Sequence, residues 1–310
     1  MRSTRVRATA LVMLSASVFL GCAKVEAPTI LDARAKPPVI YAVNYPLTWM
    51  AERIGGDAAD VRFAAPPDVD PAYWQPDRDT VAALQQADGI LLNGADYAKW
   101  VKTSTLPEKA LVNTSAAFSD QYLTVADATM HSHGPEGMHA HEGTDFNTWL
   151  DPVLAAKQAE AVCEALCTWV PEQAEIFRDR LSRVKNDLAE LDEALQAYAS
   201  LIGSAPLIAS HPVYGYLAKR YRWNLVSLHW EPGEMPSAEE WKAFEKRLQT
   251  HPATTMIWED TPDARIAMRL DALGIRIAVF APCGNRPEEG DYLSVMQENV
   301  KQLRRVLGDV

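Results

Sequence analysis

The sequence has no excess of basic residues. It contains 30 Lys and Arg residues against 41 Asp and Glu residues, which gives a formal net charge of −11 at pH 7. Proteins that bind nucleic acid need basic surface to neutralise phosphate, so this charge argues against a nucleic-acid partner. Hydrophobic residues, in contrast, make up 48% of the chain. That share is enough to build a buried core and argues against wholesale disorder.

The common catalytic signatures are also missing. The sequence contains no nucleophile elbow, no His-Glu-x-x-His pair and no glycine-rich phosphate loop. An enzyme in which a metal-bound water attacks a substrate is therefore the weakest hypothesis. We expect a protein that binds a ligand and is not an enzyme.

Cysteine is scarce, with four residues in the chain. Beyond Cys22 there are three, at 163, 167 and 283, and an odd number cannot all pair in an oxidising compartment. Cys163 and Cys167 are four residues apart in a helical run, so two thiols on one helical face could bind a metal. Small core residues are the favoured interpretation, since no further ligand lies nearby in the sequence.

Long hydrophobic runs are absent except near the N-terminus. Residues 8–20 are apolar but too few to be a good membrane span, and three arginines precede them. Gly21-Cys22 follows, which is the pattern of a lipoprotein signal, so we expect cleavage before Cys22 and lipidation of that cysteine. The alternative is an ordinary secretory signal. Both predict export, as a periplasmic or outer-surface protein.

The rest of the chain alternates strand and helix patterns on either side of a helical middle. Residues 172–199 contain no Gly or Pro and place apolar residues at spacings of three and four, which predicts one helix about 42 Å long. The pattern predicts an α/β protein with two lobes, each with a mostly parallel sheet flanked by helices, joined by this long rigid helix. The expected boundaries are a signal peptide at 1–21, a lipid-anchored tether at 22–37, an N-terminal lobe at 38–170, a linking helix at 171–200 and a C-terminal lobe at 201–310.

Ligands of such lobes bind at the carboxyl ends of parallel strands. His211 ends one predicted strand, His229 another, and Glu259-Asp260 a third. We expect His211 to be functional, whereas His229 fits the core or the rim as well as a ligand role.

Several short motifs occur in order along the chain. They are Ala65-Pro66-Pro67 with Asp70-Pro71, the segment 87–94 (ADGILLNG), Trp149-Leu150-Asp151-Pro152, the segment 211–221 (HPVYGYLAKRY) and Gly290-Asp291-Tyr292. Together they resemble the substrate-binding lipoproteins of zinc and manganese ABC importers. The resemblance implies capture of a divalent metal outside the cytoplasm, delivery to an ABC-transporter permease, and attachment to the membrane through a lipid anchor.

Members of that family bind their metal with three histidines and a carboxylate divided between the lobes, and here the pattern departs. The first histidine position is Ala72, the second is Asn147, and the usual carboxylate position is Ala281; only His211 matches. An alanine cannot coordinate a metal, and an amide oxygen is a weak zinc ligand beside imidazole.

The segment 131–143, HSHGPEGMHAHEG, offers replacements in the form of His131, His133, His139 and His141. Its Gly-Pro-Glu-Gly centre has turn chemistry, which would bring the two His-x-His arms together as a hairpin. We therefore favour ordered metal ligands, with Glu259 as the carboxylate, over the alternative of a low-affinity metal collector. Histidine-rich ligation favours zinc, although manganese or another divalent metal remains open.

A second hypothesis is that the cleft binds an organic ligand between aromatic walls. The candidate walls are Tyr45, Trp49, Tyr73, Trp74, Trp149 and Trp230. In the metal hypothesis the residues expected to line the cleft beside the ligands are Tyr73, Trp74, Asn147, His229 and Asp260.

Overall fold

The computed structural model describes residues 36–67, 69–125, 130–132, 138–140, 143–230 and 233–307. Residues 37–310 form one compact unit. The predicted signal peptide, Cys22 and nearly all of the tether lie outside the described residues, so they stay predictions. Within the described ranges no helix is both long and apolar enough to span a membrane.

The N-terminal lobe is built on a parallel sheet with the strand order β2-β1-β3-β4. Its strands are β1 (Val39–Ala42), β2 (Asp60–Phe63), β3 (Gly89–Leu92) and β4 (Leu111–Asn113). The helices α1 (Tyr45–Gly55) and α2 (Arg78–Gln85) connect the first three strands. Asn44 caps α1 and Asp77 caps α2 through hydrogen bonds to backbone amides, which fixes where each helix begins.

The C-terminal lobe repeats this plan with the order β10-β9-β11-β12, again entirely parallel. Its strands are β9 (Pro206–Ala209), β10 (Asn224–Ser227), β11 (Thr255–Trp258) and β12 (Arg276–Val279). The accompanying helices are α5 (Gly215–Tyr221), α6 (Ala238–Thr250), α7 (Ala264–Ala272) and α8 (Tyr292–Arg305). The prediction of two α/β lobes is confirmed.

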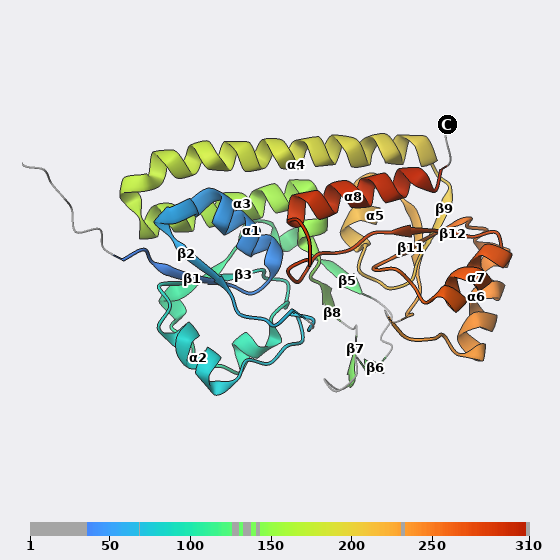
Figure 1. The fold of residues 1–310 in the computed structure, drawn as a ribbon, viewed down its shortest axis with the longest axis horizontal. Helices are drawn as coiled ribbons and strands as arrows, with labels where there is room; N and C mark the ends of the chain where they lie inside the picture. The colour runs from blue at the N-terminus through green and yellow to red at the C-terminus, as the bar shows by residue number, and fades with distance from the viewer. Residues whose placement is uncertain are drawn as a thin grey trace, which may run out of the picture. The chain divides into compact units, whose positions relative to one another are not determined.

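Two long helices follow the N-terminal sheet, and the second of them joins the lobes. Helix α3 (Pro152–Trp169) begins where Asp151 caps it, and α4 (Ala174–Ile202) follows after a single 3-10 turn, η7 (Pro171–Gln173). Figure 1 shows α4 running along one side of both lobes, above α3 and α8. The apolar positions that predicted α4 are buried from Phe177 to Tyr198, except Leu181, which is half-buried against the same core. At 1.5 Å per residue this helix is about 43 Å long, which makes it a stiff connection.

Shorter elements complete the described chain. The 3-10 helices are η1 (Gly56–Ala58), η2 (Lys99–Lys102), η3 (Glu108–Ala110), η4 (Ala116–Gln121) and η6 (Thr148–Leu150). Strands β5 (Leu123–Val125) and β8 (Gly143–Asp145) pair antiparallel, and between them β6 (Met130–Ser132) pairs antiparallel with β7 (Met138–Ala140). His131 is opposite His139 in this register. The antiparallel pairing predicted for the two histidine arms is thus present in the described backbone.

Candidate functional site

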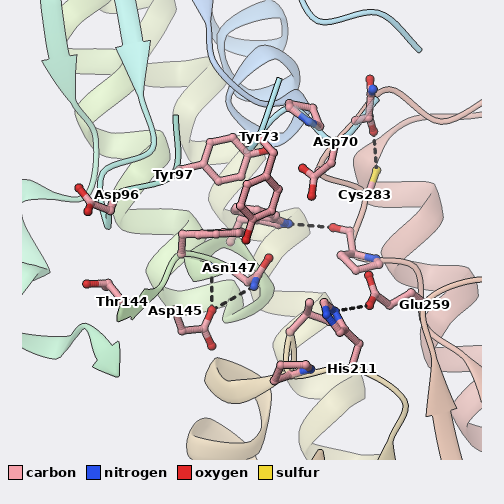
Figure 2. Close-up of a pocket in the computed structure, with 18 of the residues that line it drawn as sticks. Asp70, Tyr73, Asp96, Tyr97, Thr144, Asp145, Asn147, His211, Glu259 and Cys283 are labelled. Carbon is pink, nitrogen blue, oxygen red and sulfur yellow. Dashed lines mark hydrogen bonds and ion pairs between the residues drawn. The ribbon is translucent and has the colours of Figure 1, made fainter. Parts of the chain in front are cut away.

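A cavity of about 390 Å³ is lined by residues of both lobes (Figure 2). The N-terminal lobe contributes residues 69–71, Tyr73, 96–97, Lys99, 143–147 and Trp149, and the C-terminal lobe contributes residues 211–213, Glu259 and 282–285. Most of these segments follow directly after strands, at the carboxyl ends of the two sheets. This is the edge at which ligands bind in open parallel sheets.

His211 and Glu259 form the polar pair at the C-terminal side of the cavity. His211 follows β9 and Glu259 follows β11, and the two strands are neighbours in the sheet, so both side chains emerge at one edge. The Nδ1 atom of His211 lies 2.9 Å from Oε1 of Glu259, and the imidazole is 5% exposed. A carboxylate this close to Nδ1 favours a proton on that nitrogen, which leaves Nε2 as the atom through which His211 would bind a metal.

Asn147 faces this pair from the N-terminal lobe (Figure 2). Its backbone N and its Nδ2 both donate to Oδ1 of Asp145, at 2.9 Å and 3.0 Å. The donors of the amide are therefore turned toward Asp145, and within the described part of the chain no hydrogen bond engages its Oδ1. Asn147 is 6% exposed and lines the cavity, so it presents a neutral oxygen there.

Asp145 also lines the cavity and was missed in the sequence. Burial raises the pKa of its carboxyl from 3.8 to about 7, against the lowering effect of the two hydrogen bonds from Asn147. Its backbone oxygen accepts from the Tyr216 hydroxyl at 3.0 Å, which ties β8 to α5. The only signal in the sequence was an acid two residues before the substituted position 147.

The two other substituted positions carry no ligand. Ala72 is buried with 1% of its surface exposed, and its backbone N donates to Oδ1 of Asp70 at 2.8 Å. Ala281 is fixed through its backbone, whose N and O both bond to the Asn299 side chain at 2.9 Å and 2.8 Å. Neither side chain can bind a metal, since alanine has no donor atom.

Aromatic rings form one wall of the cavity. Tyr97 meets Phe146 edge to face at 5.1 Å between centroids and meets Trp149 at 5.5 Å, and Tyr73 lies 6.2 Å from Phe146. Of the aromatic walls expected from the sequence, Tyr73 and Trp149 line this cavity, while Tyr97 and Phe146 were not anticipated.

The remaining aromatic candidates pack elsewhere. Trp230 lies in the core of the C-terminal lobe, 4.7 Å from Trp241. Trp74 packs edge-on against Trp100 at 6.2 Å. Trp49 donates its indole N–H to Asp291, and Tyr45 lies against Phe63. Four of the six rings expected to form cavity walls therefore lie elsewhere, where their packing stabilises the lobes.

Two polar candidates also lie outside the cavity lining. His229 is half-buried after β10, which ends at Ser227. Asp260 is exposed, and its Oδ1 accepts from the Thr261 backbone at 2.6 Å. Figure 2 places Glu259, the residue before Asp260, in the cavity. Successive residues leave the end of a strand in different directions, so only one of the two acids reaches the site.

The histidine loop is placed only in part. His131 and His139 are described by their backbone, as opposite residues of β6 and β7. His133, His141 and the side chains of all four loop histidines lie outside the described residues. Among the side chains that the structure describes, no group of three or more His, Cys, Asp or Glu residues could hold a metal ion.

The Cys283 thiol lines the cavity. Burial and the nearby Asp291 carboxylate raise its pKa to about 12, so it stays protonated in the metal-free protein. Cys163 is buried, and Cys167 packs partly buried against the same core, which fits the expected structural role.

Contacts between the lobes brace the cavity. Asn285 donates its side-chain amide to the carbonyls of Pro66 at 2.7 Å and Val69 at 2.7 Å, next to Asp70. Trp149 donates its indole N–H to the carbonyl of Pro282 at 2.8 Å. These bonds hold the two walls of the cavity together.

Comparison with known proteins gives one consistent match. A family model described as zinc-uptake complex component A, periplasmic (ZnuA), matches residues 40–306. The zinc-binding lipoprotein AdcA of Streptococcus pneumoniae is 26% identical over 277 residues, which cover 86% of this chain but 55% of AdcA. The high-affinity zinc uptake system protein ZnuA of Bacillus subtilis is 25% identical over 308 residues, with coverage of 95% and 96%. This chain thus spans only about half the length of the first relative.

Solved structures show the same fold. The metal-dependent lipoprotein YcdH of Bacillus subtilis matches with a TM-score of 0.73 at 22% identity, covering 86% of this chain and 97% of YcdH. The Zn(II)-bound ZnuA-like domain of Streptococcus pneumoniae AdcA matches with the same TM-score and identity, covering 86% of this chain and 98% of that domain. Two parallel sheets and a long connecting helix are therefore an arrangement shared with solved proteins.

Proposed function

Because the chain belongs to the family of periplasmic zinc-uptake complex component A proteins, we propose that it captures zinc outside the cytoplasm for an ABC importer. The observation that carries this proposal is His211, which is held by Glu259 in a cavity between the two lobes. The surrounding acids Asp70, Asp145 and Glu259 suit a cationic ligand. Manganese and other divalent ions are the competing cargoes.

The histidine loop supplies the ligands that positions 72 and 147 lack. Two or three of His131, His133, His139 and His141 join His211, and Glu259 supports the His211 ring and offers its second carboxylate oxygen. The topology supports this ligand set, since the loop leaves β5 and returns through β8, whose last residue, Asp145, already lines the cavity. Coordination by imidazoles matches the ligand preference of zinc.

The protein acts by binding and not by catalysis. Its partners are the metal ion, the permease of the importer and, through a lipid on Cys22, the membrane. The alternative of a non-metal ligand between Tyr73, Tyr97, Phe146 and Trp149 predicts no zinc binding tighter than that of a variant without loop histidines.

Zinc content and competitive zinc titration test the proposal. We expect one tightly bound zinc per chain in the wild type. Replacing the four loop histidines by alanine should weaken zinc affinity by more than about 100-fold. Loss of a residue that only supports a metal ligand costs at most roughly that much, and these histidines are proposed to be ligands themselves. The matched control is His251→Ala, because His251 bonds to the Leu207 carbonyl away from the cavity. Unchanged affinity in the loop variant would make the loop a collector, and absence of bound zinc in the wild type would refute the function.

A further inference from the structure

The hydroxyl of Tyr97 is a buried polar group without a hydrogen-bond partner among the described residues. Tyr97 is 2% exposed and lines the cavity between the lobes. Most buried polar side-chain atoms in proteins are hydrogen-bonded, so an unpartnered one needs an explanation. A ligand that accepts this hydrogen bond is one such explanation.

The backbone before Tyr97 is strained in a way that brings this residue into the cavity. After β3, Gly94, Ala95 and Asp96 have φ values of 76°, 48° and 65°. Glycine adopts the left-handed region readily, but alanine and aspartate do so at an energetic cost. Local strain of this kind concentrates at binding sites, where the surrounding structure holds it in place. Here the left-handed turn ends at Tyr97.

The ring of Tyr97 does not depend on its hydroxyl for position. Phe146 and Trp149 hold the ring from two sides, with interplanar angles of 89° and 84°. Next to the hydroxyl lies Gly284, where an added Cβ would sit 3.5 Å from the Tyr97 oxygen and 3.6 Å from the Trp149 ring. Burial, together with the nearby Asp70 and Tyr73, raises the pKa of Tyr97 well above 10, so the hydroxyl stays a proton donor.

The cavity has two chemically different sides. Figure 2 shows His211 and Glu259 on one side, Tyr97, Tyr73 and Asp70 on the other, and Asn147 between them. A volume of about 390 Å³ falls within the range of small-molecule sites and exceeds what a single metal ion needs. Lys99 adds a positive charge to the second side, with its Nζ 5.0 Å from the centre of the Tyr73 ring.

We propose that the cavity takes its metal together with a small hydroxycarboxylate chelator. One carboxylate of the chelator takes the metal position that the Glu259 carboxylate fills when zinc binds alone, at the His211 side, and another lies toward Lys99. The chelator's hydroxyl accepts a hydrogen bond from Tyr97 and donates to the Asp70 carboxylate, which a plain carboxylate could not do. This inference rests on the proposed metal capture and names the form in which the metal arrives.

Equilibrium dialysis of the full exported chain with radiolabelled citrate, with and without equimolar zinc, tests this inference. We expect about one citrate per chain in the presence of zinc and none in its absence. Tyr97→Phe should weaken citrate retention by up to about tenfold, the effect of losing one hydrogen bond between neutral groups. Tricarballylate, which lacks the hydroxyl of citrate, should be retained correspondingly less. Gly284→Ala should also reduce retention, because its methyl group enters the space beside Tyr97.

Tyr198→Phe is the matched control. The Tyr198 hydroxyl is likewise buried without a partner among the described residues, but Tyr198 packs against Trp223 away from the cavity. It should retain citrate as the wild type does, and zinc-free Tyr97→Phe should melt no lower than the wild type. Citrate that only strips zinc from the protein, or equal retention by both Phe variants, would overturn the inference. Failure of zinc alone to bind would instead overturn the proposed function.

Discussion

The Nδ1 atom of His211 lies 2.9 Å from the Oε1 atom of Glu259, and the two residues follow neighbouring strands of one parallel sheet. This contact determines which ring nitrogen of His211 is left for a metal. It also places a negative charge behind the ring, which strengthens the imidazole as a ligand. Metal affinity should therefore depend on Glu259 as well as on His211.

Replacing Glu259 by glutamine should weaken zinc binding about 10- to 100-fold, the usual cost of losing an outer-shell partner. Competitive titration against a chromogenic chelator measures the change. Asp260→Asn is the matched control, since this neighbouring acid is exposed and lies outside the cavity lining. Equal affinities for the two variants would show that Glu259 neither orients His211 nor binds the metal.

Asp145 should make the stability of the metal-free protein depend on pH. Burial raises the pKa of this carboxyl from 3.8 to about 7, so between these values the folded protein binds a proton that the unfolded chain releases. Stability should then fall as pH rises through about 4 to 7 and level off above. Asp145→Asn stays neutral and should melt about 3 °C or more above the wild type at pH 8 but not at pH 4.

The pKa of Asp263 is shifted in the opposite direction from that of Asp145, so its effect on stability should also be opposite. Hydrogen bonds from Arg265 lower the pKa of its exposed carboxyl to about 2, so it stabilises the fold above its ordinary pKa, and this contribution is lost as pH falls toward 2. Asp263→Asn should therefore lower the melting temperature at pH 8. If Asp145→Asn also melted lower than the wild type at pH 8, the assignment of a costly buried charge would be wrong.

Arg220 should contribute strongly to the free energy of unfolding. It bonds to both carboxylate oxygens of Asp192 on α4, at 2.6 Å and 2.5 Å, and lies 3.4 Å from Asp151 at the start of α3. These partly buried charges connect α5, which follows His211, to both long helices. Arg220→Met should cost about 3 kcal/mol in urea denaturation.

The exposed pair Arg183–Asp179 on α4 is the control, and Arg183→Met should cost less than about 1 kcal/mol. Similar losses for the two methionine variants would mean that the Arg220 contacts contribute no more than a surface ion pair.

Local sequence signals predicted the fold well. The apolar spacing of residues 172–199 predicted one long helix, and it matches the buried face of α4. His211 and Glu259 could be placed at strand ends for the same reason. In each case the information lies within a few residues of the feature it determines.

The cavity itself was less predictable. A left-handed turn places Tyr97 in the cavity, and the pairing of β8 with β5 places Asp145 there. No local residue pattern shows that these two side chains line a cavity, because the cavity exists only where the two lobes meet. Trp230 and Trp74 were expected in the cavity wall but pack against other rings. The sequence alone cannot distinguish an aromatic ring in a cavity wall from one in a core. Residues such as these are positioned by contacts between segments far apart in the sequence.

Zinc K-edge X-ray absorption of the zinc-loaded protein tests the central claim most directly, since it counts the histidine ligands. The proposed site predicts three or four imidazole nitrogens at about 2.0–2.1 Å, one from His211 and the others from the loop, and loss of this signature in His211→Ala. A spectrum with no more than one imidazole, or with sulfur at about 2.3 Å, would contradict the account.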